Sequence, residues 1–169
     1  MTIRIAMWSG PRNISTAMMR SWENRVDCCV VDEPFYAAYL AATGLEHPCR
    51  DEILAAQAND YHAVIEQITS GETATPLQYL KQMTHHMPSG MDMDWCVGLR
   101  HCFLIRDPGQ VIASYLQKMP SVSEDDIGIR RQAGKRPQMF AFLFKAIDRP
   151  LAGRLVPSHV GHFVAPTNG

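Results

Sequence analysis

Short apolar runs alternate with turn residues and helical patterns in the first part of the chain. Residues 3–8 form an apolar run that predicts a buried strand, and the turn-forming segment Ser9-Gly10-Pro11 ends it. Apolar residues then recur at helical spacing from Ile14 to Trp22. A second interior strand is predicted at residues 28–31, and Asp32-Glu33-Pro34 stops it because an X-Pro step favours extended geometry. This order predicts a β-α-β unit with parallel strands and a right-handed crossover.

The middle of the chain, residues 35–86, has helical periodicity in several pieces. One piece contains Ile65 and Ile68, and a loop follows at Ser70-Gly71. Another piece has Leu77 and Leu80, with Lys81 and Thr84 following, at spacings that also fit a helix. We therefore expect this part of the chain to be mostly helical.

Strand, loop and helix recur further along. The apolar run from Cys102 to Ile105 meets Arg106-Asp107-Pro108, and apolar residues from Val111 to Leu116 then lie on one side of a predicted helix. Such alternation predicts an α/β fold with a central parallel sheet flanked by helices, and ligands of such folds bind beyond the carboxyl ends of the strands. Both strand-to-helix loops should therefore face one crevice.

The last third of the chain has weaker patterns. A helix is plausible over Ser123–Arg131, where a serine precedes three acids, and Met139–Ile147 has the pattern of an apolar helix. Residues 150–169 are rich in glycine and proline and have no clear period, so we expect them to be irregular.

Composition and charge narrow the class of protein. The 169 residues suit one globular domain, with 46% apolar and 20% charged residues. A net charge of -1 argues against a nucleic-acid-binding surface, so a phosphate site would have to be local. The sequence has neither a signal-peptide core nor an apolar stretch of roughly 20 residues, which favours a cytoplasmic protein that does not enter a membrane. Its oligomeric state cannot be read from these patterns.

The loop from Ser9 to Thr16 is the first candidate site. A loop between a strand and a helix presents free backbone N–H groups and the positive end of the helix dipole, both of which favour an anion. Arg12 adds a guanidinium, and Ser15 and Thr16 add hydroxyls that can donate to phosphate oxygens. The segment is not a Walker A loop, since Ile14 and Ser15 stand where glycine and lysine are needed. An ordinary N-capped turn explains it equally well.

The second candidate site has the same placement. Arg106 would project from the end of a strand, and Ser114 lies in the first turns of the following helix, so both could reach one phosphate. In the alternative interpretation Arg106 pairs with Asp107 and Ser114 is a neutral helix residue.

Together the two segments resemble the sulfotransferase superfamily. Arg12-Asn13-Ile14-Ser15-Thr16 is similar to its first loop, with Ile14 at a position where the commoner pattern has glycine, and Arg106-Asp107-Pro108 with Ser114 matches its second motif and spacing. The resemblance implies a three-layer P-loop-type fold. It also implies that Arg12, Asn13, Ser15 and Thr16 bind the 5′ phosphosulfate of 3′-phosphoadenylyl sulfate, and that Arg106 and Ser114 bind its 3′ phosphate.

Two further segments resemble the parts of sulfotransferases that contact the acceptor. His86 in the segment 81–88 matches the His-Leu-Pro stretch that supplies the catalytic base in many cytosolic sulfotransferases, and histidine suits that task because its usual pKa is about 6.5. The histidine could instead end a helix. Glu33-Pro34 resembles a step in bacterial sulfotransferase-like proteins, so Glu33 and Tyr36 are candidates for acceptor binding. A solvated acid followed by core aromatics is the alternative.

The resemblance extends over residues 3–132 and implies a sulfotransferase-like domain at 1–134, followed by an atypical segment at 135–169. The implied reaction moves a sulfuryl group from the nucleotide donor to a hydroxyl or amine of a small-molecule acceptor and leaves 3′,5′-ADP. Arg12 and His86 would serve catalysis, and no metal is required. The alternatives are a non-catalytic nucleotide-binding or interaction protein and a P-loop small-molecule kinase.

Overall fold

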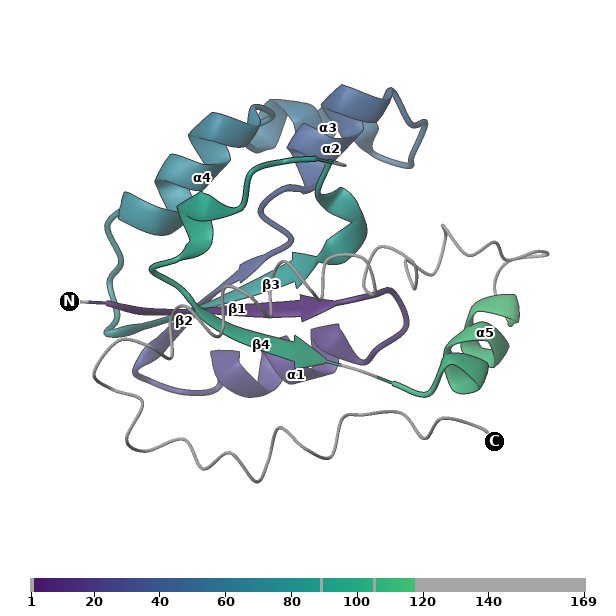
Figure 1. Cartoon of the computed structure of the whole chain (residues 1–169), viewed down its shortest axis with the longest axis horizontal. Coiled ribbons are helices and arrows are strands. Elements are labelled where there is room, and N and C mark those ends of the chain that lie inside the picture. The colour runs from purple at the N-terminus through teal and green to yellow at the C-terminus, as the bar shows by residue number, and fades with distance from the viewer. Residues whose placement is uncertain (1, 89, 105, 118–169) are drawn as a thin grey trace.

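Four parallel strands form the centre of the molecule, and helices cover both faces (Figure 1). The computed structural model describes residues 2–88, 90–104 and 106–117. The strands lie in the order β2-β3-β1-β4. Their bounds are Ile3–Ser9 for β1, Cys28–Asp32 for β2, Leu77–Met83 for β3 and Arg100–Leu104 for β4. The predicted α/β architecture with a parallel sheet between helical layers is confirmed.

The helices divide between the two faces of the sheet. The helix α1 (Ser15–Glu23) lies on one face, and α2 (Tyr36–Thr43), α3 (Arg50–Ala56) and α4 (Tyr61–Ser70) lie on the other (Figure 1). Two short 3-10 helices, η1 (Thr84–His86) and η2 (Asp94–Cys96), belong to the segment of the chain that connects β3 to β4. The last described helix, α5 (Pro108–Leu116), lies beyond the carboxyl end of β4. Among these described helices, none has the length and apolar character that crossing a membrane would demand.

The predicted strands that precede both candidate loops are confirmed to within two residues, and the helices that follow these loops are confirmed to within three. The predicted helix through Leu77 and Thr84 is wrong, because residues 77–83 form β3, which pairs with β1 on one side and β2 on the other. Apolar residues three and four apart fit a helix by chance here, whereas a strand covered on both faces needs no alternation. The expected elements at 123–131, 139–147 and 150–169, and the segment 135–169, lie outside the described residues.

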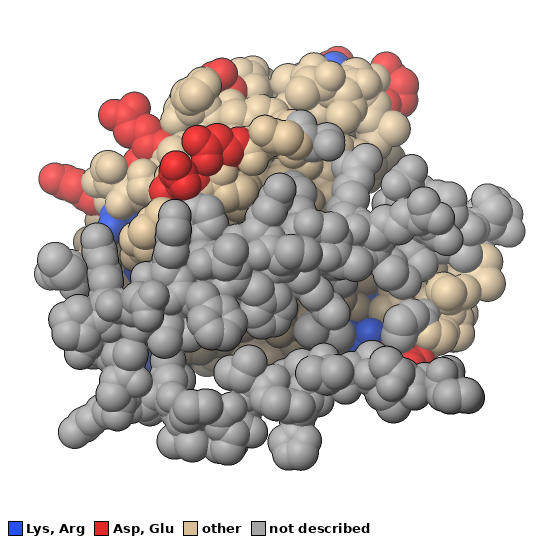
Figure 2. Space-filling view, in the orientation of Figure 1, with Lys and Arg blue, Asp and Glu red and all other residues tan. Residues whose placement is uncertain are grey.

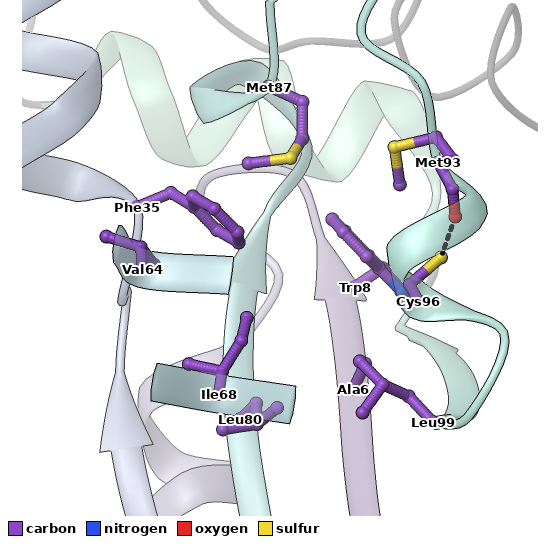
Figure 3. Packing of buried hydrophobic residues seen from close by; sticks show 10 residues of the cluster. All are labelled: Ala6, Trp8, Phe35, Val64, Ile68, Leu80, Met87, Met93, Cys96 and Leu99. Carbon is purple, nitrogen blue, oxygen red and sulfur yellow. Dashed lines mark hydrogen bonds between the residues drawn. The ribbon is translucent and has the colours of Figure 1, made fainter. Parts of the chain in front are cut away.

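Alternate residues of the central strands enter two separate cores. On the face covered by α4, Ala6, Trp8 and Leu80 pack with residues of the helices and of the β3–β4 connection (Figure 3). On the opposite face, Met7 and Tyr79 pack with Met19 of α1. Both sides of β1 are therefore buried, which explains its nearly continuous apolar sequence. The side chains of a strand alternate between the two faces of the sheet, and this alternation also fixes the pairing register of β1. A shift of the pairing by one residue would move the side chains of each core to the other face.

The carboxyl ends of the strands are level with one another. Ser9 at the end of β1 pairs in register with Met83 of β3 and with Leu104 of β4, and Asp32 of β2 pairs with Lys81 of β3. The loops that leave these strands therefore meet at one edge of the sheet, as the sequence predicts for an α/β fold.

The connection from β1 to α1 carries backbone strain. Ile14, the residue before α1, has φ 55 and ψ 18, a left-handed conformation that is unfavourable for a β-branched residue. Its side chain is 62% exposed, so little apolar burial offsets this strain. Glycine would adopt the same backbone without a Cβ clash.

Replacing Ile14 should test this strain. We expect Ile14→Gly to be more stable than Ile14→Ala by up to about 1 kcal/mol, because only glycine removes the left-handed penalty while both variants lose the side chain. Urea unfolding of the two variants and the native chain measures the difference. An Ile14→Ala variant more stable than Ile14→Gly would contradict a strained loop.

Polar residues are buried where β3 ends. Lys81, Gln82, Thr84 and His86 are all at most 4% exposed. Burial, together with the neighbouring His85 and Lys81, lowers the pKa of His86 to about 2. The folded chain therefore holds His86 neutral.

Acid should destabilise the fold through His86. In the unfolded chain a histidine has a pKa of about 6.5, so below that pH the unfolded state binds a proton that the folded state excludes. The free energy of unfolding should fall by about 2 kcal/mol from this residue between pH 7 and pH 5. Urea unfolding should show this loss in the native chain and in His62→Asn, an exposed control, but not in His86→Asn. Equal losses in all three proteins would contradict the buried neutral histidine.

Candidate functional site

The loop after β1 leaves the amino end of α1 uncapped. The cap position is Ile14, and no side chain accepts a hydrogen bond from the first turn. The alternative of an ordinary side-chain-capped turn is therefore not what the loop adopts. Asn13 is buried, and its Nδ2 donates to the carbonyl oxygen of Leu104 at 3.2 Å, which ties this loop to the end of β4. The loop is therefore held in place, and the backbone N–H groups of the first turn of α1 have no side-chain acceptor.

Two arginines join this loop to α5. Arg106 Nη1 donates to the carbonyl oxygen of Arg12 at 3.0 Å, and Arg106 Nε donates to Gln110 Oε1 at 3.2 Å. Arg12 in turn donates from Nε to Ser114 Oγ at 3.2 Å and from Nη2 to the Ser114 carbonyl at 3.1 Å. Asp107, the alternative partner of Arg106, instead accepts from the Gln110 N–H at 3.0 Å and caps α5. These hydrogen bonds thus join two segments about a hundred residues apart at the carboxyl ends of the strands.

These contacts surround a hollow of about 300 Å³, which we call the first hollow. Its described lining consists of Arg12, Asn13, Ile14, Ser15, Thr16, Arg106 and Ser114. Every residue that the sequence suggested for the nucleotide donor is in this set, and the only addition is Ile14. Two guanidinium groups, two serine hydroxyls and one threonine hydroxyl, with no acid among these residues, suit an anion.

A second hollow has a volume of about 590 Å³. Its described lining is Pro11, Glu33, Tyr36, Tyr39, Leu45, His47, Met83, His85, His86 and Tyr115. The acceptor-side candidates Glu33, Tyr36 and His86 therefore lie together. Pro11 precedes Arg12 and Tyr115 follows Ser114, so the same two segments contribute to the linings of both hollows.

Lys81 fixes the carboxylate of Glu33 in the second hollow. Its Nζ lies 2.7 Å from Glu33 Oε1 and 2.7 Å from Asp32 Oδ1. The Glu33 backbone N–H also donates to the Lys81 carbonyl at 3.0 Å, and Glu33 has the left-handed φ of 48. Burial acts to lower the pKa of Lys81, but the bonds to Asp32 and Glu33 outweigh it and raise that pKa overall, so the lysine is charged.

His86 is enclosed by aromatic rings beside this carboxylate. Its ring stacks with Tyr36 at 5.1 Å and with Tyr39 at 4.9 Å between centroids. Its Nε2 lies 3.8 Å from Glu33 Oε2, too far for a hydrogen bond, and its Nδ1 has no partner among the described residues. The Tyr61 hydroxyl donates to the His86 carbonyl at 2.8 Å and fixes the backbone. A neutral imidazole is thus held next to an ionised carboxylate.

Sequence reasoning missed several residues of the second hollow and its support. Lys81 was assigned to a helix, and only its position in β3 brings it to Asp32 and Glu33. Tyr39 had a usable signal, because it follows Tyr36 by three residues in a helix and so faces the same side. Among the described residues there is no group of three or more His, Cys, Asp or Glu side chains arranged to hold a metal ion.

Two curated proteins of Arabidopsis thaliana are similar to the chain. Branched-chain-amino-acid aminotransferase-like protein 1 is 34% identical over 116 residues, and branched-chain-amino-acid aminotransferase-like protein 2 is 33% identical over 117 residues. Each match covers 69% of this chain but 21% of the relative, so the chain spans about a fifth of the length of these proteins. No solved structure matches the chain significantly.

A family model gives the wider match. The model described as Sulfotransferase domain matches residues 3–149, a stretch that includes β1 with its loop, the Glu33 and His86 segments, and the Arg106 to Ser114 segment. The matched region thus contains every described residue of both hollows. The chain therefore belongs to the sulfotransferase domain family.

Proposed function

We propose that the protein transfers a sulfuryl group from 3′-phosphoadenylyl sulfate to a hydroxyl or amine of a small-molecule acceptor. The observation that carries this proposal is the first hollow, where Arg12, Ser15, Thr16, Arg106 and Ser114 meet although they come from two distant segments. Family membership supports the reaction class. The second hollow, to which the same two segments contribute, supplies space for an acceptor.

The donor would occupy the first hollow with its two charged ends on different segments. Arg12, Ser15, Thr16 and the uncapped end of α1 would bind the 5′ phosphosulfate, with Asn13 fixing the loop, and Arg106 and Ser114 would bind the 3′ phosphate. Arg12 now donates twice to Ser114. Binding would exchange those bonds for stronger charge-assisted bonds to anionic oxygens, so the closed arrangement keeps the site assembled without blocking it.

In the transfer step, the acceptor oxygen or nitrogen forms a bond to sulfur while the bond from sulfur to the bridging phosphate oxygen breaks. The departing 3′,5′-ADP takes the negative charge of that oxygen, which Arg12 and the loop N–H groups would stabilise. The acceptor proton goes to a base in the second hollow. No described residue would need to form a covalent intermediate.

His86 is the proposed base, with Glu33 as its partner. Neutral His86 can accept a proton, but a pKa of about 2 makes it a weak base unless a neighbouring charge stabilises its protonated form. The Glu33 carboxylate, 3.8 Å from Nε2, would stabilise the imidazolium as it forms. Glu33 could also accept the proton itself, since it lines the same hollow and its Oε2 is not bound to Lys81.

The donor site can be tested without knowing the acceptor. Native protein should bind 3′,5′-ADP about 10- to 100-fold tighter than 5′-AMP, because charge-assisted bonds to the 3′ phosphate are worth about 1.5–3 kcal/mol. Arg106→Ala should lose that preference while still binding 5′-AMP, and Arg20→Ala, an exposed arginine of α1, should behave as the native chain. Titration calorimetry measures these six affinities and the affinity of the native protein for ATP with magnesium. Tighter binding of ATP with magnesium than of 3′,5′-ADP would favour a kinase, and an unchanged preference in Arg106→Ala would remove the 3′-phosphate assignment.

The base can be tested by single and double variants. His86→Asn and Glu33→Gln should each lower sulfuryl transfer by about 10²- to 10⁴-fold while 3′,5′-ADP affinity changes little, and the double variant should be no slower than the slower single variant. Transfer from labelled donor is measured with an acceptor found by screening hydroxyl and amine compounds, and His62→Asn is the control. Full activity in His86→Asn with loss in Glu33→Gln would make Glu33 the base. Donor binding without transfer to any acceptor would indicate the non-catalytic alternative.

A further inference from the structure

The two hollows have opposite charge. Arg12 and Arg106 are the only Asp, Glu, Lys or Arg residues among the described residues lining the first hollow, and Glu33 is the only such residue among those lining the second. The outer surface also has a charge pattern, since acidic side chains gather over the helical layer in the view of Figure 2. A ligand that spans both hollows would therefore meet positive charge at one end and negative charge at the other.

Lys81 does not cancel the negative charge of the second hollow. Its one ammonium is shared between two carboxylates, those of Asp32 and Glu33, so Lys81 alone cannot neutralise both. Because the side chain of Lys81 is 5% exposed, it is not placed to bind an incoming group itself. Its bond to Glu33 Oε1 instead leaves Oε2 facing His86, a neutral side chain outside hydrogen-bonding distance. Glu33 Oε2 thus has capacity for a donor that the described residues do not fill.

The side chains around Glu33 Oε2 strengthen its attraction for a cation. Tyr36 and Tyr39 enclose the imidazole of His86, and burial, with Glu33 and Tyr39 adding to it, raises the pKa of the Tyr36 phenol, so that hydroxyl stays protonated. His86 is 2% exposed and has an unpartnered Nδ1. Aromatic and buried neutral groups screen a charge less than water does, so a carboxylate among them attracts a cation more strongly.

We propose that the second hollow selects an acceptor carrying an ammonium group, which pairs with the Glu33 carboxylate, and discriminates against acceptors that carry a negative charge. The term acceptor rests on the function proposed above, whereas the charge preference rests on the contacts of Glu33 alone. Glu33 acts here as a specificity-determining residue, and Lys81 is a positioning residue that holds Oε1 and leaves Oε2 on the side of His86.

Three phenols of similar size that differ in charge provide the test: tyramine is cationic, 4-ethylphenol is neutral and 4-hydroxyphenylacetate is anionic. Binding is measured by nuclear magnetic resonance at about pH 8, above the usual titration range of histidine, with and without 3′,5′-ADP. Binding rather than transfer is measured because Glu33 also takes part in the proposed chemistry. Ring signals of Tyr36 and His86 report whether a compound enters the second hollow.

Tyramine should bind at least about fivefold tighter than the anionic compound, which corresponds to an ion pair of about 1 kcal/mol, and added salt should reduce the difference. Glu33→Gln should remove the preference, while Glu66→Gln, a matched change at an exposed position of α4, should retain it. The dispersion of the amide signals of Glu33→Gln in the same spectra verifies that this variant is folded.

Three results would overturn the proposal: equal affinities for the three compounds, a preference that survives in Glu33→Gln, or no shift of the Tyr36 and His86 signals by tyramine at millimolar concentration. The outcome is separable from the proposed function. A tyramine preference without 3′,5′-ADP binding would reject the sulfuryl donor and keep the charge assignment. Binding of 3′,5′-ADP without a tyramine preference would keep the sulfuryl donor and reject the charge assignment.

Discussion

The parallel pairing of β3 with both β1 and β2 determines where every candidate residue lies. Because β3 runs between these strands in the same direction, its carboxyl end brings Lys81, η1 and His86 to the edge where Asp32 and Glu33 leave β2. The same pairing sets β1 level with β3, so the Arg12 loop starts at that edge. Adding β4 on the other side of β1 brings Arg106 and α5 to the same place. Antiparallel pairing at any of these positions would send one group to the opposite edge.

The backbone is most constrained at this edge. Among the described non-glycine residues, positive φ occurs at Arg12, Ile14, Glu33 and Cys49, and three of these four belong to the loops of the two hollows. Such conformations need neighbouring contacts to hold them. The Arg12 carbonyl accepts from Arg106, and the Glu33 N–H donates to the Lys81 carbonyl. Hydrogen bonds between segments thus hold the strained residues that shape both sites.

The sequence predicted the positions of the two strand-to-helix loops of the candidate site because their signals are local. Turn residues at Ser9-Gly10-Pro11 and Arg106-Asp107-Pro108 interrupt clear apolar runs, and a helical pattern follows each. The contact between Arg12 and Ser114 follows from neither segment alone, since it requires β4 to lie beside β1. The low pKa of His86 likewise depends on its enclosure by Tyr36 and Tyr39, which a spacing pattern does not reveal.

Lys81 shows how an incorrect element assignment hides a residue that supports the candidate site. In a helix, a lysine at that position would be an ordinary solvent-exposed side chain, whereas in β3 it is buried against two carboxylates. Burying charges requires desolvation that the ion pairs only partly offset, so well-packed apolar residues of similar volume are often as stable in such a place. Stability alone therefore gives little reason for this arrangement. What the buried lysine does is orient Glu33, with one carboxylate oxygen bound by Lys81 and the other facing His86. A residue in the core of the sheet thus determines how the charged group of the second hollow is placed.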